Sequence, residues 1–167
     1  GGAIVAMTGA LLATALAGTD VEGVSRWVRL GGFAIQPSLI LLPLMIVAFS
    51  QARSVSATAG IIVAAAAIAL QPDRAMAGML VLGLATLAMI RRDRHSAVVL
   101  IASIAGFAVT LARADPLPAV PHVEQVLYSS FSVHVAAGLA VLGGLVLLLV
   151  PAIVGWRRDY GNRATYA

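Results

Sequence analysis

The stretch from Gly18 to Pro37, GTDVEGVSRWVRLGGFAIQP, decides how the chain is read. It is the first place where a strongly apolar sequence becomes polar, and it separates two apolar segments. It contains two acids, two arginines and a tryptophan: Asp20, Glu22, Arg26, Arg29 and Trp27. Water and lipid headgroups satisfy such charges at a membrane surface, where an indole ring is also well placed. The stretch therefore indicates the mouth of a membrane bundle, with an ordinary interfacial loop as the simpler alternative.

The composition favours lipid as the surroundings of most of this chain. Of its 167 residues, 60% are hydrophobic and 11% are charged, and the mean hydropathy is +0.98. Soluble domains are about 25% charged. All eleven basic residues are arginines in the connections, so the net charge of +4 indicates orientation and headgroup contact and not nucleic-acid binding. The absence of cysteine excludes disulfides and thiolate ligands, and we expect no cofactor and no metal site.

Six apolar runs can be marked: residues 2–18, 33–51, 54–71, 75–90, 96–112 and 133–156. Most approach the length of about 20 residues that a helix needs to cross a bilayer core of about 30 Å. The runs do not alternate polar with apolar residues, so we expect no strands. The predicted fold class is all-α, a polytopic integral membrane helical bundle of about six transmembrane helices, in a single domain over residues 1–167.

The connections between these runs fall alternately on two sides. One side collects seven arginines, at positions 53, 91, 92, 94, 157, 158 and 163, and the other collects four, at positions 26, 29, 74 and 113. The positive-inside rule then places the first side in the cytoplasm. We expect a multi-pass protein of the bacterial cytoplasmic (inner) membrane with both termini cytoplasmic. Outer loops at about 19–32, 71–74 and 113–132 then share one face.

Local signals refine the helix boundaries. Pro37 predicts a helix start, because its missing N–H is not needed there, and Pro43 predicts a kink. Asp73 predicts an N-cap for the fourth helix. Small residues recur every four positions, as at Gly60 and Ala64, and such seams let helices approach closely in lipid. The alternative is that alanine and glycine are simply abundant.

Two short motifs resemble the SEDS family, the FtsW/RodA-type peptidoglycan polymerases. The first is Val21 to Gly31, VEGVSRWVRLG, followed by Gln36-Pro37-Ser38, where the family has N-G-x-x-R-W-I-x-L-G and then Q-P-S-E. The second is Leu70-Gln71-Pro72-Asp73, which is similar to the family's L-Q-P-D before a helix. A weaker likeness joins Pro121-His122-Val123-Glu124 to the family's H-T-D. The resemblance covers about residues 1 to 150 and implies the family's middle helices, with its first two and last two helices outside this sequence.

The chain departs from the family pattern at charged positions. Leu39 stands where the family has the Glu of Q-P-S-E, and Leu42 stands where it has a Lys three residues later. We expect these two leucines to replace a buried ion pair, an exchange that need not reduce stability. Glu22 replaces the motif Asn, and Glu124 stands in place of the catalytic Asp. These departures indicate a shortened and divergent relative.

The resemblance implies roles for several residues if the site is active. Glu124 would be the catalytic general base that takes a proton from a sugar hydroxyl, with His122 assisting. Planar guanidinium groups suit phosphate oxygens, so arginines of the outer loops would bind pyrophosphate or lipid phosphate. The predicted ligand-binding set is Arg26, Trp27, Arg29, Asp73, Arg74 and His122. The alternative is a solvated Glu124 and arginines that bind lipid headgroups.

The function expected from the sequence is that of a non-catalytic SEDS-like integral membrane subunit, packed within a larger membrane protein complex. Its partners would be the lipid bilayer and other integral membrane proteins. One alternative is a lipid-linked glycan (peptidoglycan) glycosyltransferase of the FtsW/RodA type, with a lipid-linked glycan as substrate. Another is an isoprenoid- or lipid-binding membrane module. No apolar run carries a charge at its centre, which argues against an ion-coupled carrier.

Overall fold

The computed structural model describes residues 1–21, 24–51, 54–113, 125–147 and 150. They belong to two compact units, Gly1–Leu117 and Pro118–Ala167, and each unit is described by itself. Helices dominate the described residues, so the prediction of a mostly helical chain is confirmed. A single domain over residues 1–167 stays a prediction.

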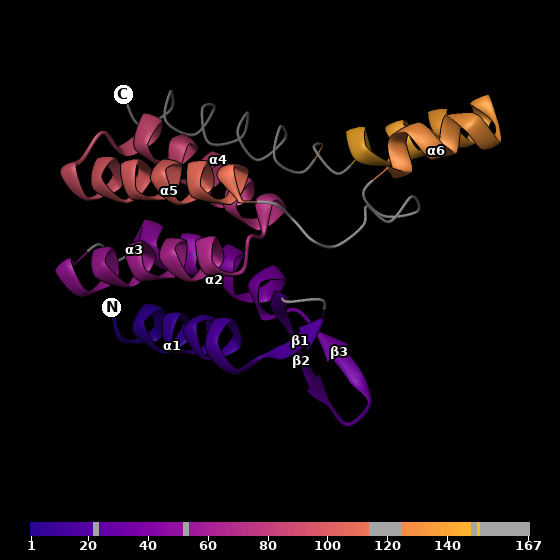
Figure 1. The fold of residues 1–167 in the computed structure, drawn as a ribbon. Helices are drawn as coiled ribbons and strands as arrows, with labels where there is room; N and C mark the ends of the chain where they lie inside the picture. Colours follow the sequence, from indigo (N-terminus) through magenta and orange to yellow (C-terminus); the bar gives the residue numbers. More distant parts are fainter. Residues whose placement is uncertain (22–23, 52–53, 114–124, 148–149, 151–167) are drawn as a thin grey trace, which may run out of the picture. The chain divides into compact units, whose positions relative to one another are not determined.

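The first unit contains five helices (Figure 1), and the bounds of each agree with one of the predicted apolar runs to within four residues. They are α1 Gly2–Ala17, α2 Pro37–Gln51, α3 Val55–Leu70, α4 Arg74–Arg91 and α5 Arg94–Ala112. Side-chain caps fix three of the starts. Ser54, Asp73 and Asp93 accept hydrogen bonds from main-chain N–H groups three residues later, at 3.2, 3.1 and 3.0 Å. The predicted start at Pro37 and the predicted cap at Asp73 are confirmed.

Helix α3 packs against both α1 and α5 and runs parallel to α5. Thr58 Oγ1 lies 2.8 Å from His95 Nδ1, which joins the starts of α3 and α5. At the opposite end, Arg113 Nη1 donates to the Ala69 carbonyl at 3.1 Å. We call the end with residues 18–21, 24–36, 71–73 and 113 the hairpin end, and the end with residues 54 and 91–95 the arginine end.

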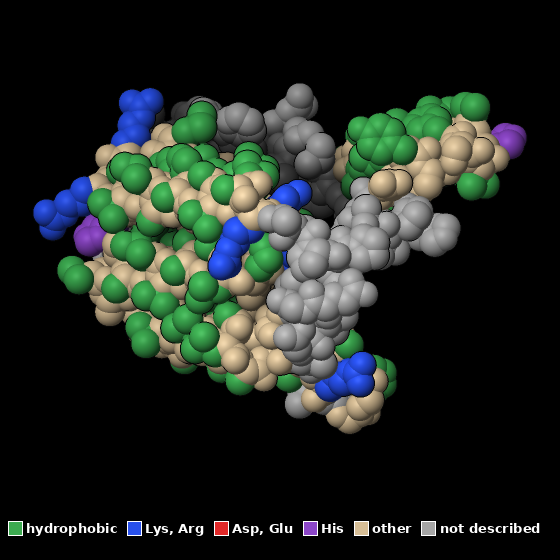
Figure 2. All heavy atoms as spheres, in the orientation of Figure 1, with side chains coloured by type: hydrophobic (Ala, Val, Ile, Leu, Met, Phe, Trp, Pro, Cys, Tyr) green, Lys and Arg blue, Asp and Glu red, His purple; other side chains and the backbone are tan. Residues whose placement is uncertain are grey.

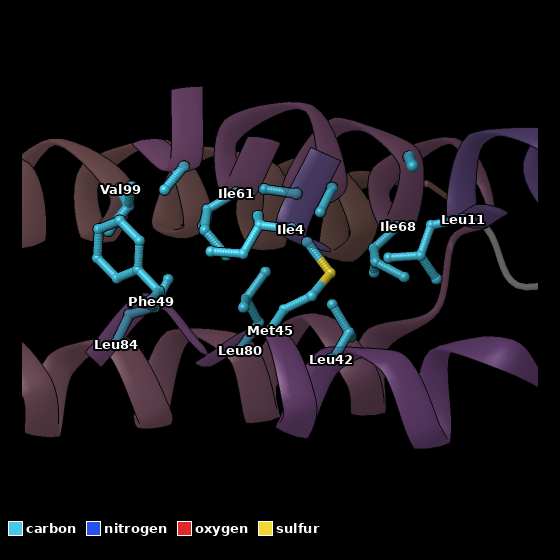
Figure 3. Close-up of a cluster of buried hydrophobic side chains, with 14 of the residues drawn as sticks. Ile4, Leu11, Leu42, Met45, Phe49, Ile61, Ile68, Leu80, Leu84 and Val99 are labelled. Carbon is cyan, nitrogen blue, oxygen red and sulfur yellow. The ribbon is translucent and has the colours of Figure 1, made fainter. Parts of the chain in front are cut away.

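The core of the first unit receives side chains from all five helices (Figure 3). Helix α3 contributes most, with eight buried residues. Phe49 of α2, Leu84 of α4 and Val99 of α5 are fully buried and lie together at one end of the cluster. The large buried side chains labelled in Figure 3 are Ile4, Leu11, Leu42, Met45, Phe49, Ile61, Ile68, Leu80, Leu84 and Val99.

Glycines let two pairs of helices approach closely. The Thr8 hydroxyl donates to the Gly60 carbonyl at 3.0 Å, and a Cβ added at Gly60 would lie 2.8 Å from Ile4 Cγ2. A Cβ added at Gly106 would lie 3.1 Å from the Ala65 carbonyl oxygen. The predicted small-residue seam at Gly60 and Ala64 is therefore confirmed at Gly60, on the face of α3 that meets α1. Gly9 of α1, in contrast, faces open space.

Three short strands follow α1, and they correct the expectation of a chain without strands. They are β1 Thr19–Val21, β2 Val24–Leu30 and β3 Phe33–Ile35, in the antiparallel order β1-β2-β3. Gly31 and Gly32 form the turn between β2 and β3, with φ of 56° and 90°. Two consecutive positive φ values are the requirement of a tight two-residue hairpin, and glycine meets it without strain.

The register between β1 and β2 shifts next to Arg26. Thr19 pairs with Trp27 but Asp20 pairs with Ser25, so Arg26 is the extra residue on β2. Such a bulge bends the strand and changes the direction of the side chain that it carries. The hairpin thus presents Arg26 differently from its neighbours on β2.

The second unit contains α6, Val126–Val133, and the helix Val135–Leu147. His134 separates them in an extended conformation, and its Nδ1 accepts the Ala136 N–H at 3.1 Å. An atom added at Gly138 would collide with the Phe131 ring, so the two helices meet closely at these residues. The predicted run 133–156 accordingly begins as a helix at Val135.

Two helices, α4 and α5, are long and apolar enough to cross a membrane, with 18 and 19 residues. Only 22% of each apolar window is buried, whereas the core helix of a soluble protein would be mostly covered. The other apolar helices are shorter: Gly2–Ala17, Pro37–Gln51, Val55–Leu70 and Val135–Leu147. A helix of 16 residues spans about 24 Å, less than the bilayer core of about 30 Å. The described residues thus supply two helices of membrane length, fewer than the six that the sequence predicted.

Candidate functional site

The two motifs singled out in the sequence meet at the hairpin end. Arg26 of β2 donates from Nε to the Gln71 carbonyl at 2.9 Å and from Nη2 to the Pro72 carbonyl at 2.7 Å. These carbonyls follow the end of α3, where main-chain acceptors have no helical partner. A guanidinium placed there satisfies them and carries the charge that a helix C-terminus favours. Arg26 therefore ties the hairpin to the turn between α3 and α4.

Gln36 makes a second link between the motifs. Its Nε2 donates to Asp73 Oδ2 at 2.6 Å and to the Ser38 hydroxyl at 3.1 Å. The other carboxylate oxygen of Asp73, Oδ1, accepts the Met76 N–H at the start of α4. Asp73 is only 4% exposed, so both of its oxygens are satisfied within a nearly buried site.

Arg74 and Arg113 close the same end from the other side. Arg74 donates from Nη2 to the Arg113 carbonyl at 2.8 Å, beyond the last residue of α5. Arg113 in turn donates from Nη1 to the Ala69 carbonyl. Arg74 thus joins the start of α4 to the end of α5, and Arg113 joins the end of α5 to the last turn of α3. Like Arg26, both arginines donate hydrogen bonds to carbonyls at helix ends.

Gln71 lies at the centre of this network and is 2% exposed. Its Nε2 lies 3.5 Å from the Leu11 carbonyl of α1, a long hydrogen bond. Its Oε1 is buried without a donor among the described residues. A buried amide oxygen normally has a partner, and this atom is the one buried side-chain acceptor without a partner in the described part of the chain.

The structure brings together three of the six predicted ligand-binding residues: Arg26, Asp73 and Arg74. Trp27 neighbours Arg26 on β2 and is half-buried, and Arg29 is exposed. The side chain of Arg29 has no hydrogen bond within the described residues. His122 and the predicted general base Glu124 lie outside the described residues, as does Glu22. Gln36 and Gln71, which join the two motifs, were not predicted as site residues, although both stand in the quoted motifs.

The two leucines at family charge positions do not form a buried pair. Leu42 is fully buried in the core, but Leu39 is 53% exposed. The expectation that both replace a buried ion pair is therefore wrong for Leu39. Side chains three residues apart point about 60° away from each other around a helix, so Leu39 lies at the edge of the face that Leu42 buries.

The chemistry of the described network is that of a structural cross-link. Its arginines donate to main-chain carbonyls, and its carboxylate accepts a main-chain N–H and an amide. Within the described residues it presents no nucleophile with an adjacent base. No three His, Cys, Asp or Glu side chains gather in the part of the chain that the structure describes.

The wider surface of the first unit is apolar. Hydrophobic side chains cover the visible face of α1, α3 and α5, and arginines project beyond them (Figure 2). Leu82, Met89 and Ile101 are 71%, 76% and 67% exposed. Exposed patches of this extent mark a membrane or protein interaction surface.

Neither a family model, nor a curated protein, nor a solved structure matches the chain.

Proposed function

We propose that the chain is a non-catalytic integral membrane subunit that packs within a larger membrane protein complex. The observation that supports this function best is the use of the motif arginines. Arg26 and Arg74 donate to carbonyls at helix ends, so these guanidinium groups are engaged within the fold and not held ready for a phosphate.

The proposal includes more than the two helices of membrane length. Helices α3 and α5 are joined at both ends, through Thr58–His95 and Arg113–Ala69. If α5 crosses the bilayer, α3 lies at the same depth, and α1 packs against α3. Helices of about 24 Å are accommodated by local thinning of the bilayer and by polar ends that reach the interface. The first unit would then cross the membrane with five helices and place its hairpin end outside.

Single cysteines test this arrangement, because the sequence has no cysteine of its own. Phe33→Cys labels the hairpin, where Phe33 is 75% exposed, and Arg94→Cys labels the arginine end. A membrane-impermeant maleimide added to intact cells should react with the hairpin variant only. The variant at the arginine end should react only after the membrane is opened. Reaction of both variants from the same side, or recovery of the chain in the soluble fraction, contradicts the proposed arrangement.

A second experiment tests the absence of catalysis and the presence of partners. The purified chain should form no glycan polymer from a lipid-linked precursor. Polymerisation that Glu124→Gln abolishes would instead establish the glycosyltransferase alternative. From native membranes in mild detergent, the chain should elute as a heteromer of fixed stoichiometry by light scattering. A bare monomer with no partner contradicts the subunit proposal.

A further inference from the structure

The turn between α4 and α5 holds an arginine where the backbone favours glycine. Arg92 has φ 48° and ψ 35°, a left-handed conformation, and it is the one non-glycine residue with positive φ among the described residues. Helices commonly end with glycine at this position because a Cβ is strained there. A strained side chain at an exposed turn suggests that the side chain itself is needed.

The three arginines of this turn differ from those at the hairpin end. Arg91, Arg92 and Arg94 are all exposed. In the described ranges, none of their side chains makes a hydrogen bond or an ion pair, whereas the hairpin-end arginines donate to main-chain carbonyls. The only acid in the turn, Asp93, accepts from the N–H and the hydroxyl of Ser96. Three positive charges within four residues are thus left facing outward.

Apolar side chains continue directly from this charged turn along both helices. Met89 and Ile90 precede it on α4 and are 76% and 69% exposed, and Ile101 follows it on α5. With a rise of 1.5 Å per residue, Ile101 lies about 10 Å along α5 from Arg94. Figure 2 shows arginine side chains at the ends of α4 and α5, next to a hydrophobic surface, with no acidic side chain visible among the described residues of that face. Positive charge at the end of an apolar face matches a molecule with an anionic head and a long apolar tail.

We propose that the α4–α5 turn binds the headgroup phosphate of an anionic phospholipid through Arg91, Arg92 and Arg94. The acyl chains lie along the exposed apolar side chains of α4 and α5. A single guanidinium group can donate two parallel hydrogen bonds to the oxygens of one phosphate. This property explains an arginine at a position where glycine would be free of strain. The inference rests on the membrane location proposed above, but not on the absence of catalysis or on a protein partner.

The experiment uses the full chain in nanodiscs of phosphatidylcholine and phosphatidylglycerol. The phosphatidylglycerol retained on transfer to detergent is measured by native mass spectrometry. Wild-type protein should retain phosphatidylglycerol selectively. Each arginine removed should weaken retention about fivefold, the effect of one basic residue near an anionic surface. Arg92→Gly should show this loss with an unchanged or higher melting temperature, because glycine relieves the left-handed strain. Arg92→Lys keeps the charge and the strain but not the paired guanidinium bonds, so it should retain less lipid than the wild type and more than Arg92→Gly.

Arg29→Gln removes the same charge from the hairpin end and should reduce retention less than Arg92→Gly does. An equal loss in both variants would show that net charge alone is responsible and would overturn the inference. So would full retention by Arg92→Gly. Displacement of the lipid by inorganic phosphate at equal concentration would assign the turn to free phosphate and overturn the lipid assignment. A chain that fails the cysteine test above refutes the membrane location, whereas an inserted chain without phosphatidylglycerol selectivity refutes this inference alone.

Discussion

Replacement of Phe49 by alanine should lower the free energy of unfolding by about 4 kcal/mol. Phe49 has no exposed surface, and its ring lies beside Leu84 and Val99, so one side chain joins α2 to α4 and α5. Truncation leaves a cavity that the surrounding helices fill only in part. The loss also includes the dispersion contacts that the surrounding side chains make with the ring, because no other group in a close-packed core moves in to replace them. Titration with SDS in mixed micelles, followed by circular dichroism, measures the change.

Val47→Ala is the matched control on the same helix. Val47 is 55% exposed and faces away from the cluster, so its truncation should change the free energy of unfolding by less than about 0.5 kcal/mol. Equal losses in the two variants would mean that α2 is not oriented as described, with Phe49 inward.

Replacement of Arg26 by methionine should lower the free energy of unfolding by about 3 kcal/mol, because it removes two charge-assisted hydrogen bonds, each of which contributes about 1.5–3 kcal/mol. Their acceptors are the Gln71 and Pro72 carbonyls. Methionine keeps the length and apolar stem of the side chain, so the loss reports the guanidinium. The same titration measures it, and protease cleavage within the hairpin reports whether the hairpin leaves the bundle.

Arg29→Met provides the comparison on the same strand. Arg29 is exposed, and its side chain makes no hydrogen bond among the described residues, so this variant should unfold like the wild type. Arg26→Met with wild-type stability would indicate that Arg26 is free to bind a ligand, and would remove the observation on which the proposed function rests. The two variants thus separate a structural arginine from a solvated one.

The helices could be predicted from the sequence because apolar runs bounded by prolines, arginines and capping residues leave few alternatives. Pro37 and Asp73 mark starts that the structure confirms. The position of α3 between α1 and α5 could not be predicted. Helix α3 is apolar on every side, so no polar face tells which residues meet other helices and which face outward. Only small residues such as Gly60 marked a contact.

The hairpin was missed although its signal is present. Val28 and Leu30 alternate with Arg29 just before Gly31-Gly32, a pattern typical of a two-residue hairpin. The membrane-length runs do not alternate, and this alternation is shorter than any of them. The alternation of the loops between the two sides of the bundle did predict that the two motifs lie at the same end. The hydrogen bonds of Arg26 to the Gln71 and Pro72 carbonyls could not be predicted in this way. A sequence indicates which charged residues share one end of a bundle, but it does not show which main-chain carbonyls the fold leaves without a partner.

The placement of α3 has a consequence for the biogenesis of the chain. Synthesis proceeds from the N-terminus, so α1 and α3 leave the ribosome before α5 exists. The Thr8–Gly60 contact can therefore form first, while the flank of α3 that carries Ala65 is still uncovered. Helices α4 and α5 follow as a pair joined by a two-residue turn, and their arrival completes the assembly. A nascent chain stalled before residue 94 should consequently expose that flank to chaperones and quality-control proteases.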